Sequence, residues 1–267
     1  MQKTNIMRNA SIYIIPLLLI SFSSVFSNER GSLFVRNYLA KEYKAHVQNW
    51  AVGQDSRGIM YFGNSDGLLE YDGVNWRLIP LPSREWVRSL DIDSAGRIWV
   101  GGSNEFGYVE QSSEKGMEYI SLVDLVPADA KPFFDIWETI IINDDVFFRA
   151  TNHLFRYSNG KLYTWKSSSG FGTSFVVNNT LFVSSIAEGL QYLKGNVLKK
   201  APQWDVFAHD PIRLAKTYNN TVAFIGTASK GFAYYSPFAH PDSCLSYINS
   251  SAASYYQKYH LKSEVQK

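Results

Sequence analysis

The feature that most constrains this chain is a repeat of short apolar segments separated by tight turns. The two clearest copies span residues 49–82 and 87–122. Each copy has an apolar segment, an Asp-Ser-x-Gly turn and an aromatic-bearing segment, and then two more segments joined by Gly-containing turns. Gly58 matches Gly96, and Gly67 matches Gly107, about 40 residues further on, which is the period of a structural repeat.

Three weaker copies follow at residues 136–166, 172–200 and 212–236. Their turns carry Asn-Asp, Asn-Asn and Asn-Gly pairs, residues that accept the positive φ angles of tight hairpins. The apolar segments between the turns have the length of strands rather than helices. The pattern therefore predicts five four-stranded units, which we place at residues 48–82, 86–122, 133–166, 170–200 and 211–236.

These units predict an all-β fold. One four-stranded unit cannot bury both of its faces alone, so neighbours must stack, and radial stacking gives a β-propeller across residues 48–238. The alternative, a linear β-solenoid, has shorter units without a four-stranded meander. We expect Leu33–Tyr43, within a leading segment at 28–47, to add a strand, and 239–267 to be a tail without repeats. The ring is then expected to be incomplete, with an open face on the last unit that allows self-association.

The N-terminus has the pattern of a secretory signal peptide. Lys3 and Arg8 precede an apolar run from Ile12 to Phe22, and Val25 and Ser27 fit a leader peptidase site. The run is too short for an ordinary membrane-spanning helix, although an uncleaved anchor that tethers the protein to the membrane is the alternative. The sequence thus predicts a signal peptide at 1–27 and a periplasmic or extracellular location.

Charge and cysteine content exclude several classes of function. Removing residues 1–27 takes away two of the 26 basic residues and none of the 24 acidic ones, so the mature chain has no net charge. A neutral surface does not favour binding of nucleic acid. The single cysteine excludes an intramolecular disulfide, and the five histidines show no metal-ligand spacing. We therefore expect no metal site and no cofactor.

Two stretches resemble a known family. They are NWAVGQDSRGIMYFGNSDGLLEYDGVNWRLI at residues 49–79 and DSAGRIWVGGSNEFGY at residues 93–108. They are similar to the propeller repeats of two-component regulators, in which an exported propeller senses a ligand and precedes a triple-tyrosine domain, a membrane helix and an output domain. The resemblance covers residues 33–236. It implies that the chain is an extracytoplasmic ligand-sensing propeller of a signal transduction regulator, here a fragment without the membrane and output domains. The partners that the resemblance implies are a small-molecule or saccharide ligand and the downstream signalling domains.

The propeller pattern also predicts where a ligand binds. Turns between second and third strands and connectors between units are expected on one rim, where convergent loops commonly form recognition sites. The candidate ligand-binding residues on this rim are Arg84, Trp86, Glu105, His153, Glu188, Asp210 and Lys230. Trp50, Trp76, Trp99, Trp137 and Trp165 fall on predicted strands, and we interpret them as core residues. The sequons Asn178-Asn179-Thr180 and Asn219-Asn220-Thr221 coincide with repeat turns and are interpreted as turn residues.

No catalytic motif appears in the sequence, so we expect a binding protein rather than an enzyme. There is no Gly-x-Ser-x-Gly element and no phosphate-binding loop, and Asp144-Asp145 falls at a predicted hairpin turn. The alternative is a secreted propeller enzyme, a lyase or a glycoside hydrolase, which needs carboxylates or His/Tyr groups near the axis.

The signal peptide generates a first prediction. The exported protein is expected to begin at Asn28, because Ser27 is the small residue before the cleavage site. N-terminal sequencing of the protein recovered from the periplasm or medium tests this expectation, and recovery of Met1 in that fraction would contradict it.

Overall fold

The computed structural model describes residues 35–82, 85–112 and 116–249. The chain divides into two compact units, Met1–Tyr38 and Leu39–Lys267. In the first unit, residues 35–38 form no regular element, and the guanidinium of Arg36 lies 4.6 Å from the ring centre of Tyr38. The helices and strands given below belong to the second unit.

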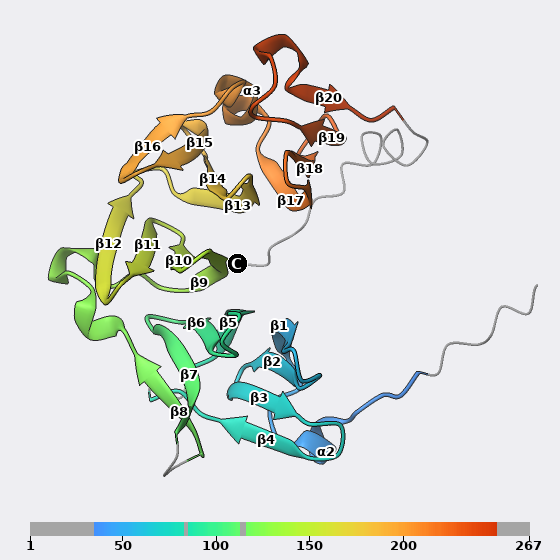
Figure 1. Cartoon of the computed structure of the whole chain (residues 1–267), viewed down its shortest axis with the longest axis vertical. Coiled ribbons are helices and arrows are strands. Elements are labelled where there is room, and N and C mark those ends of the chain that lie inside the picture. Colours follow the sequence, from blue (N-terminus) through green and yellow to red (C-terminus); the bar gives the residue numbers. More distant parts are fainter. Residues whose placement is uncertain (1–34, 83–84, 113–115, 250–267) are drawn as a thin grey trace, which may run out of the picture. The chain divides into compact units, whose positions relative to one another are not determined.

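The second unit contains five four-stranded antiparallel sheets, each with its strands hydrogen-bonded in chain order (Figure 1). The strands of the first two sheets are β1 (Asn49–Gln54), β2 (Met60–Asn64), β3 (Gly67–Tyr71), β4 (Trp76–Ile79), β5 (Val87–Ile92), β6 (Ile98–Gly102), β7 (Phe106–Ser112) and β8 (Gly116–Ser121). Those of the third and fourth are β9 (Ile136–Ile142), β10 (Asp145–Ala150), β11 (His153–Ser158), β12 (Lys161–Lys166), β13 (Phe171–Val177), β14 (Thr180–Ser185), β15 (Gly189–Lys194) and β16 (Val197–Lys200). The fifth sheet consists of β17 (Ile212–Asn219), β18 (Val222–Thr227), β19 (Phe232–Tyr235) and β20 (Leu245–Tyr247).

The helical segments among the described residues are short. They are α2 (Ala40–Tyr43), α3 (Trp204–His209) and three 3₁₀ turns, η1 (Val123–Leu125), η2 (Ala128–Ala130) and η3 (Pro241–Ser243). The expected all-β fold of five four-stranded units is therefore confirmed.

The Asp-Ser-x-Gly turns form because the aspartate bonds the backbone of its own turn. Oδ1 of Asp55 accepts hydrogen bonds from the amides of Arg57, at 2.9 Å, and Ile59, at 3.0 Å. In the second sheet, Oδ1 of Asp93 accepts hydrogen bonds from the backbone amides of Ala95, at 3.0 Å, and Arg97, at 2.9 Å. The glycine that ends each turn has positive φ, 86° at Gly58 and 81° at Gly96, which a residue with a Cβ adopts only with strain. The residues of the repeat motif thus specify a backbone turn.

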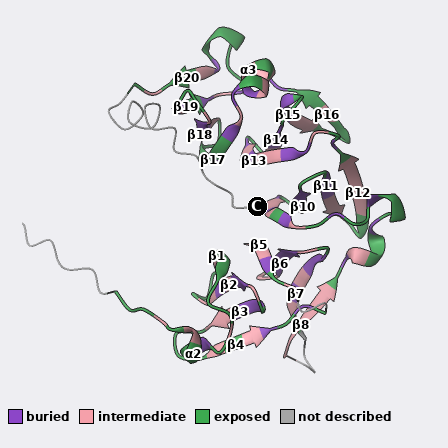
Figure 2. Ribbon diagram, turned by 180° about the vertical axis from the view of Figure 1, so that it is seen from behind, coloured by how far each residue is buried: buried purple, intermediate pink, exposed green. Residues whose placement is uncertain are grey.

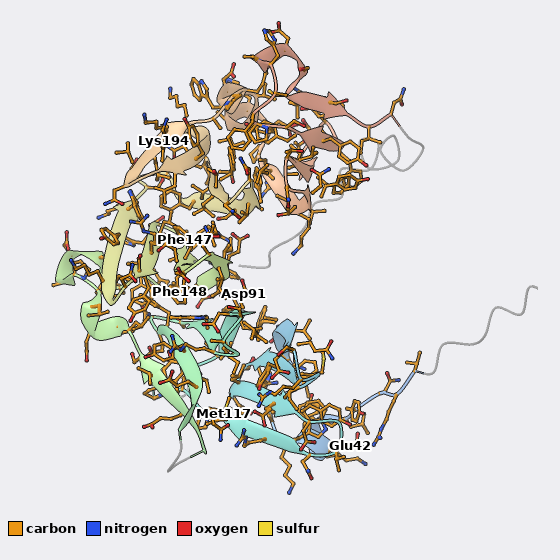
Figure 3. All side chains as sticks on the ribbon, viewed as in Figure 1. Glu42, Asp91, Met117, Phe147, Phe148 and Lys194 are labelled. Carbon is orange, nitrogen blue, oxygen red and sulfur yellow. The ribbon has the colours of Figure 1, made fainter. Side chains whose placement is uncertain are left out.

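Among the described residues, the core consists of four apolar clusters, each with residues from two consecutive sheets. Figure 2 shows the buried residues on the strands of these sheets. Each cluster contains residues of both sheets, for example Tyr61 and Val100, Trp99 and Phe148, Phe147 and Leu181, and Phe182 and Ile225. Phe147 and Phe148 are neighbours on β10 and belong to clusters on opposite sides of their sheet (Figure 3). Successive side chains of a strand point to opposite faces, so both faces of such a sheet are buried.

Side-chain hydrogen bonds also join the first strands of neighbouring sheets. Ser89 donates to the carbonyl of Ile136 at 2.9 Å, and Thr217 donates to the carbonyl of Val176 at 2.8 Å. A carboxylate also joins two first strands, because Oδ2 of Asp91 on β5 accepts a hydrogen bond from the amide of Ile141 on β9 at 3.0 Å. These bonds fix the register of one sheet against the next.

The predicted leading strand is wrong over its described part, residues 35–43. Residues 35–39 are irregular and Ala40–Tyr43 form α2. The carboxylate of Glu42 accepts a hydrogen bond from the amide of Leu39 at 2.7 Å, which closes this helical turn, and the Tyr43 ring lies 5.4 Å from that of Trp76. The hydrogen bond between Glu42 and Leu39 and the ring contact with the distant Trp76 thus hold these residues as a helical turn.

The predicted end of the fifth unit near residue 236 is also wrong. Its fourth strand, β20, pairs with β19 through Tyr235 with Leu245 and Ala233 with Tyr247. A loop containing η3 separates the two strands, and a three-residue strand is too short to show alternation. Of the predicted tail, residues from 250 onward lie outside the described part of the chain.

Gly107 is not a turn glycine as predicted. It lies within β7 opposite Val100, and a Cβ there would collide with the backbone carbonyl oxygen of Ile120. Its role is a close approach between strands. The predicted turns at the two sequons are confirmed, since Asn178 and Asn179 connect β13 to β14 and Asn220 and Thr221 connect β17 to β18.

The stacked clusters predict that removing one buried ring destabilises the protein. Phe148→Ala should lower the free energy of unfolding by about 3–5 kcal/mol, because it leaves a cavity between the second and third sheets. Val74→Ala, at an exposed turn position, should change it by less than about 0.5 kcal/mol. Urea titration followed by circular dichroism measures both, and equal effects would contradict this account.

Candidate functional site

Turns between second and third strands lie on the same rim as the segments that enter the sheets, as expected from the repeat. The amide of His46, ahead of β1, donates to Oδ2 of Asp66 at 2.7 Å. In the second sheet, Oδ1 of Asn104 accepts from the amide of Phe134 at 2.8 Å, just ahead of β9. These bonds anchor the two turns to the segments that precede β1 and β9.

Each sheet has an irregularity in register at the start of its first strand, on this rim. An extra residue on one strand of an antiparallel pair leaves that residue unpaired and redirects its side chain. In the first three sheets the unpaired residues are Trp50, Arg88 and Trp137. The same position in three consecutive sheets thus directs two indoles and one guanidinium to one region.

Arg88 is the centre of this group. Its guanidinium carbon lies 3.6 Å from the ring centre of Trp50, 4.4 Å from that of Trp86 and 5.2 Å from that of Trp137. Its Nε lies 3.2 Å from Oδ2 of Asp135, and only 10% of its side chain is exposed. A cation over an indole face is held by the negative potential of that face. We call Trp50, Trp86, Arg88, Asp135 and Trp137 the Trp–Arg cluster.

The indole N–H groups of the cluster all have protein acceptors. Those of Trp50 and Trp137 donate to the hydroxyls of Ser65 and Thr151 at 3.2 Å, and that of Trp86 donates to Oδ1 of Asp135 at 3.0 Å. The three tryptophans are nevertheless 40%, 38% and 37% exposed, in the order Trp50, Trp137, Trp86. Their N–H edges are therefore fixed while part of their apolar surface faces solvent, as in a preorganised binding surface.

The interpretation of Trp50 and Trp137 as core residues is thus wrong. For Trp99 the same interpretation is confirmed, because this side chain is buried between the second and third sheets. The unpaired bulge position makes the difference, because it removes Trp50 and Trp137 from the alternation of the strand. The sequence carries a signal for this in the first strands NWAVGQ, VRSLDI and IWETIII, whose second residues are Trp50, Arg88 and Trp137.

Of the seven predicted ligand-binding residues, only Trp86 lies in the Trp–Arg cluster, and Arg84 lies outside the described residues. Glu105 is buried and accepts hydrogen bonds from the hydroxyls of Ser121, at 2.7 Å, and Tyr119, at 3.0 Å. Burial raises the pKa of Glu105, and those two hydrogen bonds oppose the rise. Its Oε1 is thus occupied by hydrogen bonds from two residues of β8.

Asp210 and Lys230 are brought together, but through the backbone. The buried carboxylate of Asp210 accepts from the amides of Ser229, at 2.7 Å, and Lys230, at 3.2 Å, and so holds the turn between β18 and β19. Glu188 is exposed on the corresponding turn of the fourth sheet. The structure does not gather these residues with Trp86 into one site.

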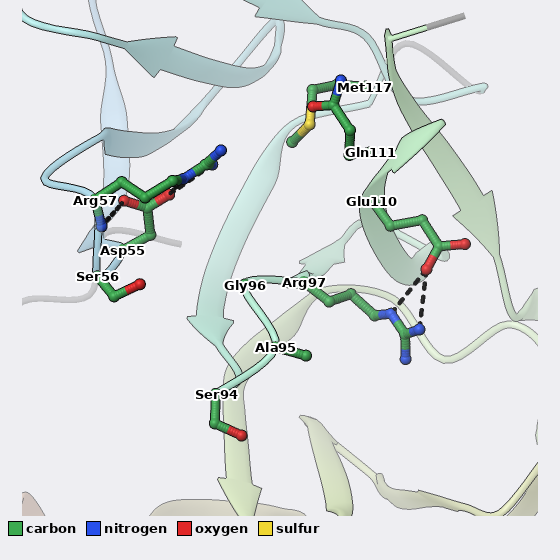
Figure 4. Close-up of a pocket in the computed structure, with 10 residues that line it drawn as sticks. All are labelled: Asp55, Ser56, Arg57, Ser94, Ala95, Gly96, Arg97, Glu110, Gln111 and Met117. Carbon is green, nitrogen blue, oxygen red and sulfur yellow. Dashed lines mark hydrogen bonds and ion pairs between the residues drawn. The ribbon is translucent and has the colours of Figure 1, made fainter. Parts of the chain in front are cut away.

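A hollow of about 380 Å³ lies among the first-to-second strand turns of the first two sheets (Figure 4). Its two arginines are paired with carboxylates, Arg57 with Asp55 at 2.7 Å and Arg97 with Glu110 at 2.9 Å. Burial alone raises the pKa of Asp55, but hydrogen bonds from the side chain of Arg57 and the amide of Ile59 outweigh it and lower the pKa. Because both guanidiniums are neutralised, the hollow favours an anionic ligand less than its arginines suggest.

Among the residues that the structure describes, no group of three or more His, Cys, Asp or Glu side chains is arranged to hold a metal ion.

His153, another predicted ligand-binding residue, is buried against Phe155, and neither of its ring nitrogens has a hydrogen-bond partner. Burial and the positive charge of Lys166 lower the pKa of His153, with a smaller opposing effect of Asp129. The folded protein therefore favours the neutral ring.

This lowered pKa generates a prediction. The unfolded chain protonates His153 near pH 6.5, whereas the folded chain does so only at lower pH, so the free energy of unfolding should fall as the pH drops below about 6.5. His153→Leu should remove that part of the pH dependence, and His209→Gln, at an exposed position, should not. Urea denaturation between pH 5 and 8 measures the difference; an unchanged slope in His153→Leu would contradict the prediction.

Comparison with protein-family models finds no match, and comparison with curated proteins finds none either. Solved structures do match. Virginiamycin B lyase from Staphylococcus aureus is 12% identical with a TM-score of 0.54, over 76% of this chain and 70% of that one. The WD40 β-propeller domain of Doa1 is 15% identical with a TM-score of 0.53, over 73% and 67%.

A third similar structure is described as the extracellular domain of a hybrid two-component system from B. thetaiotaomicron. It is 15% identical with a TM-score of 0.52, over 76% of this chain and 28% of that one. Within the described residues, no helix is long and apolar enough to cross a membrane. At these identities the comparisons show the fold alone, and that fold is a β-propeller.

Proposed function

We propose that this chain is an extracytoplasmic ligand-binding propeller of a two-component signalling system, and that the Trp–Arg cluster contacts the ligand. The observation that carries the proposal is the set of three partly exposed indoles held around one guanidinium on the rim. Ligand sites combine apolar and aromatic walls with a few fixed polar groups, and the cluster offers both.

Resemblance to sensor propellers supports the signalling part of the proposal, as does the fold shared with an extracellular domain of a two-component system. The signal-like N-terminus supports an exported protein. In this proposal the chain binds its ligand without converting it, and further signalling domains respond to the bound state.

A saccharide is the ligand class we propose. The indoles expose flat apolar surface with their N–H edges already bonded, which suits the C–H face of a sugar ring. Asp135, whose side chain is 17% exposed beside these surfaces, supplies a hydrogen-bond acceptor for hydroxyl groups.

The test is a titration of the purified mature chain with a panel of neutral and uronic-acid oligosaccharides, followed by tryptophan fluorescence and calorimetry. Trp50→Ala and Trp137→Ala should each weaken the binding found by about 2 kcal/mol, roughly thirtyfold in Kd, because they remove stacking surface. Trp165→Ala, on the outer strand β12, is the matched control and should bind like the wild type.

No binding across the panel, or equal binding by all three variants, would refute this site. Chromatography of the oligosaccharides after incubation tests the alternative of a lyase or glycoside hydrolase. Intact ligand agrees with a binding protein, and shortened or unsaturated products would establish the enzyme instead.

A further inference from the structure

A hollow of about 640 Å³ lies between the fourth sheet and the segment that follows β19 in the fifth. Its walls come from β14, β15, residues 200–202 and residues 237–238. They share no residue with the Trp–Arg cluster or with the hollow of the first two sheets. The volume falls within the range of about 300–1,000 Å³ that is typical of sites for small organic molecules.

Aromatic rings form one wall of this hollow. Phe182 and Tyr192 are paired across β14 and β15, so they share a face of the sheet, and their ring centres are 5.8 Å apart. The ring of Phe238 meets that of Phe182 edge-on, with 6.1 Å between the ring centres. Aromatic surface therefore extends from the buried Phe182 to Phe238, which is 54% exposed, and a flat apolar ring can pack on it.

Two hydrogen bonds join the segments on either side of the hollow. The hydroxyl of Tyr235 on β19 donates to the carbonyl of Pro202 at 2.8 Å, and Nε2 of Gln203 donates to the carbonyl of Pro241 at 3.2 Å. Pro202 lines the hollow after the end of β16, and Pro241 begins η3 in the fifth sheet. The two walls are therefore connected through the backbone on both sides.

The charge that lines this hollow is positive. Lys194 ends β15 and Lys200 ends β16, and both line the hollow, whose described lining includes no acidic side chain. The ammonium of Lys200 lies 3.4 Å from the ring centre of Trp204. Among the described residues, neither lysine forms an ion pair with a carboxylate. Unlike the paired arginines of the hollow in the first two sheets, these two ammonium groups favour an anionic ligand.

We propose that this hollow binds a small aromatic carboxylate. The ring of the ligand packs on Phe182 and Phe238. Its carboxylate lies beside Lys194 and Lys200. An ion pair with an exposed lysine changes Kd by at most about fivefold. Packing of the ring therefore supplies most of the affinity, and the lysines select the acid over a neutral molecule of the same shape.

The experiment compares phenylacetate with phenylacetamide, a neutral molecule of nearly the same shape, by saturation-transfer NMR on the purified mature chain. Phenylacetate should bind with a Kd of about 1 mM, as expected for a ligand of this size, and phenylacetamide about tenfold more weakly. The double variant Lys194→Gln/Lys200→Gln should bind phenylacetate about tenfold more weakly and phenylacetamide as the wild type does. Phe238→Ala should weaken both ligands by at least about threefold, because it removes ring surface.

Two sets of variants serve as controls. Lys161→Gln removes an exposed lysine on β12, outside the hollow, and should bind phenylacetate like the wild type. Trp50→Ala and Trp137→Ala alter the Trp–Arg cluster and should also leave phenylacetate binding unchanged. Circular dichroism of each variant checks that it is folded.

No binding of phenylacetate up to about 20 mM, or equal binding of the acid and the amide, would overturn the proposal. An unchanged affinity in the double lysine variant or in Phe238→Ala would place phenylacetate elsewhere and would overturn it too. Loss of phenylacetate binding in Trp50→Ala would assign this ligand to the Trp–Arg cluster, with the same consequence. Failure of every saccharide to bind would refute the Trp–Arg site alone, because none of these expectations depends on it.

Discussion

Burial of apolar sheet faces against neighbouring sheets is the interaction on which the rest of this structure depends. A single four-stranded sheet of these sequences has two apolar faces, as Phe147 and Phe148 on one strand show, and water contacts whichever face lacks a partner. Each ring buried at an interface is stabilised by the sheet that follows, so the stability of a sheet is shared with its neighbours. The end sheets differ from the others because one of their faces lacks this partner among the described sheets.

This stacking also positions the candidate site. The first strands of successive sheets lie beside one another, so an irregularity repeated at their starts places Trp50, Arg88 and Trp137 in one region, although they are far apart in sequence. Turns, connectors and first strands of this scaffold are hydrogen-bonded to each other. A cation held among indoles on such a scaffold loses little conformational freedom when a ligand arrives.

Much of the fold was predictable from local chemistry. Asp55 and Asp93 bond their own turns, Gly58 and Gly96 adopt positive φ, and the Asn pairs connect strands, all of which depend on residues within a few positions. The predictions that were wrong depended on contacts distant in sequence. Tyr43 forms a helical turn beside Trp76, Gly107 lies beneath the backbone of another strand, and β20 follows a loop that hides its pairing with β19.

The sequence by itself determined the repeat, the turn types, the strand content and hence a propeller, because these follow from spacing and from backbone preferences of single residues. Only the tertiary structure decided which rim residues meet. Glu105, His153 and Asp210 are expected on the ligand-binding rim from the sequence, and the structure buries all three among contacts within the protein. Trp137 looks like a core residue in sequence, yet its unpaired bulge position leaves it 38% exposed in the cluster with Arg88 and Trp86. The reason is that the alternation of side chains along a strand depends on that strand alone. Which side chains lie together at a site depends instead on how separate sheets stack.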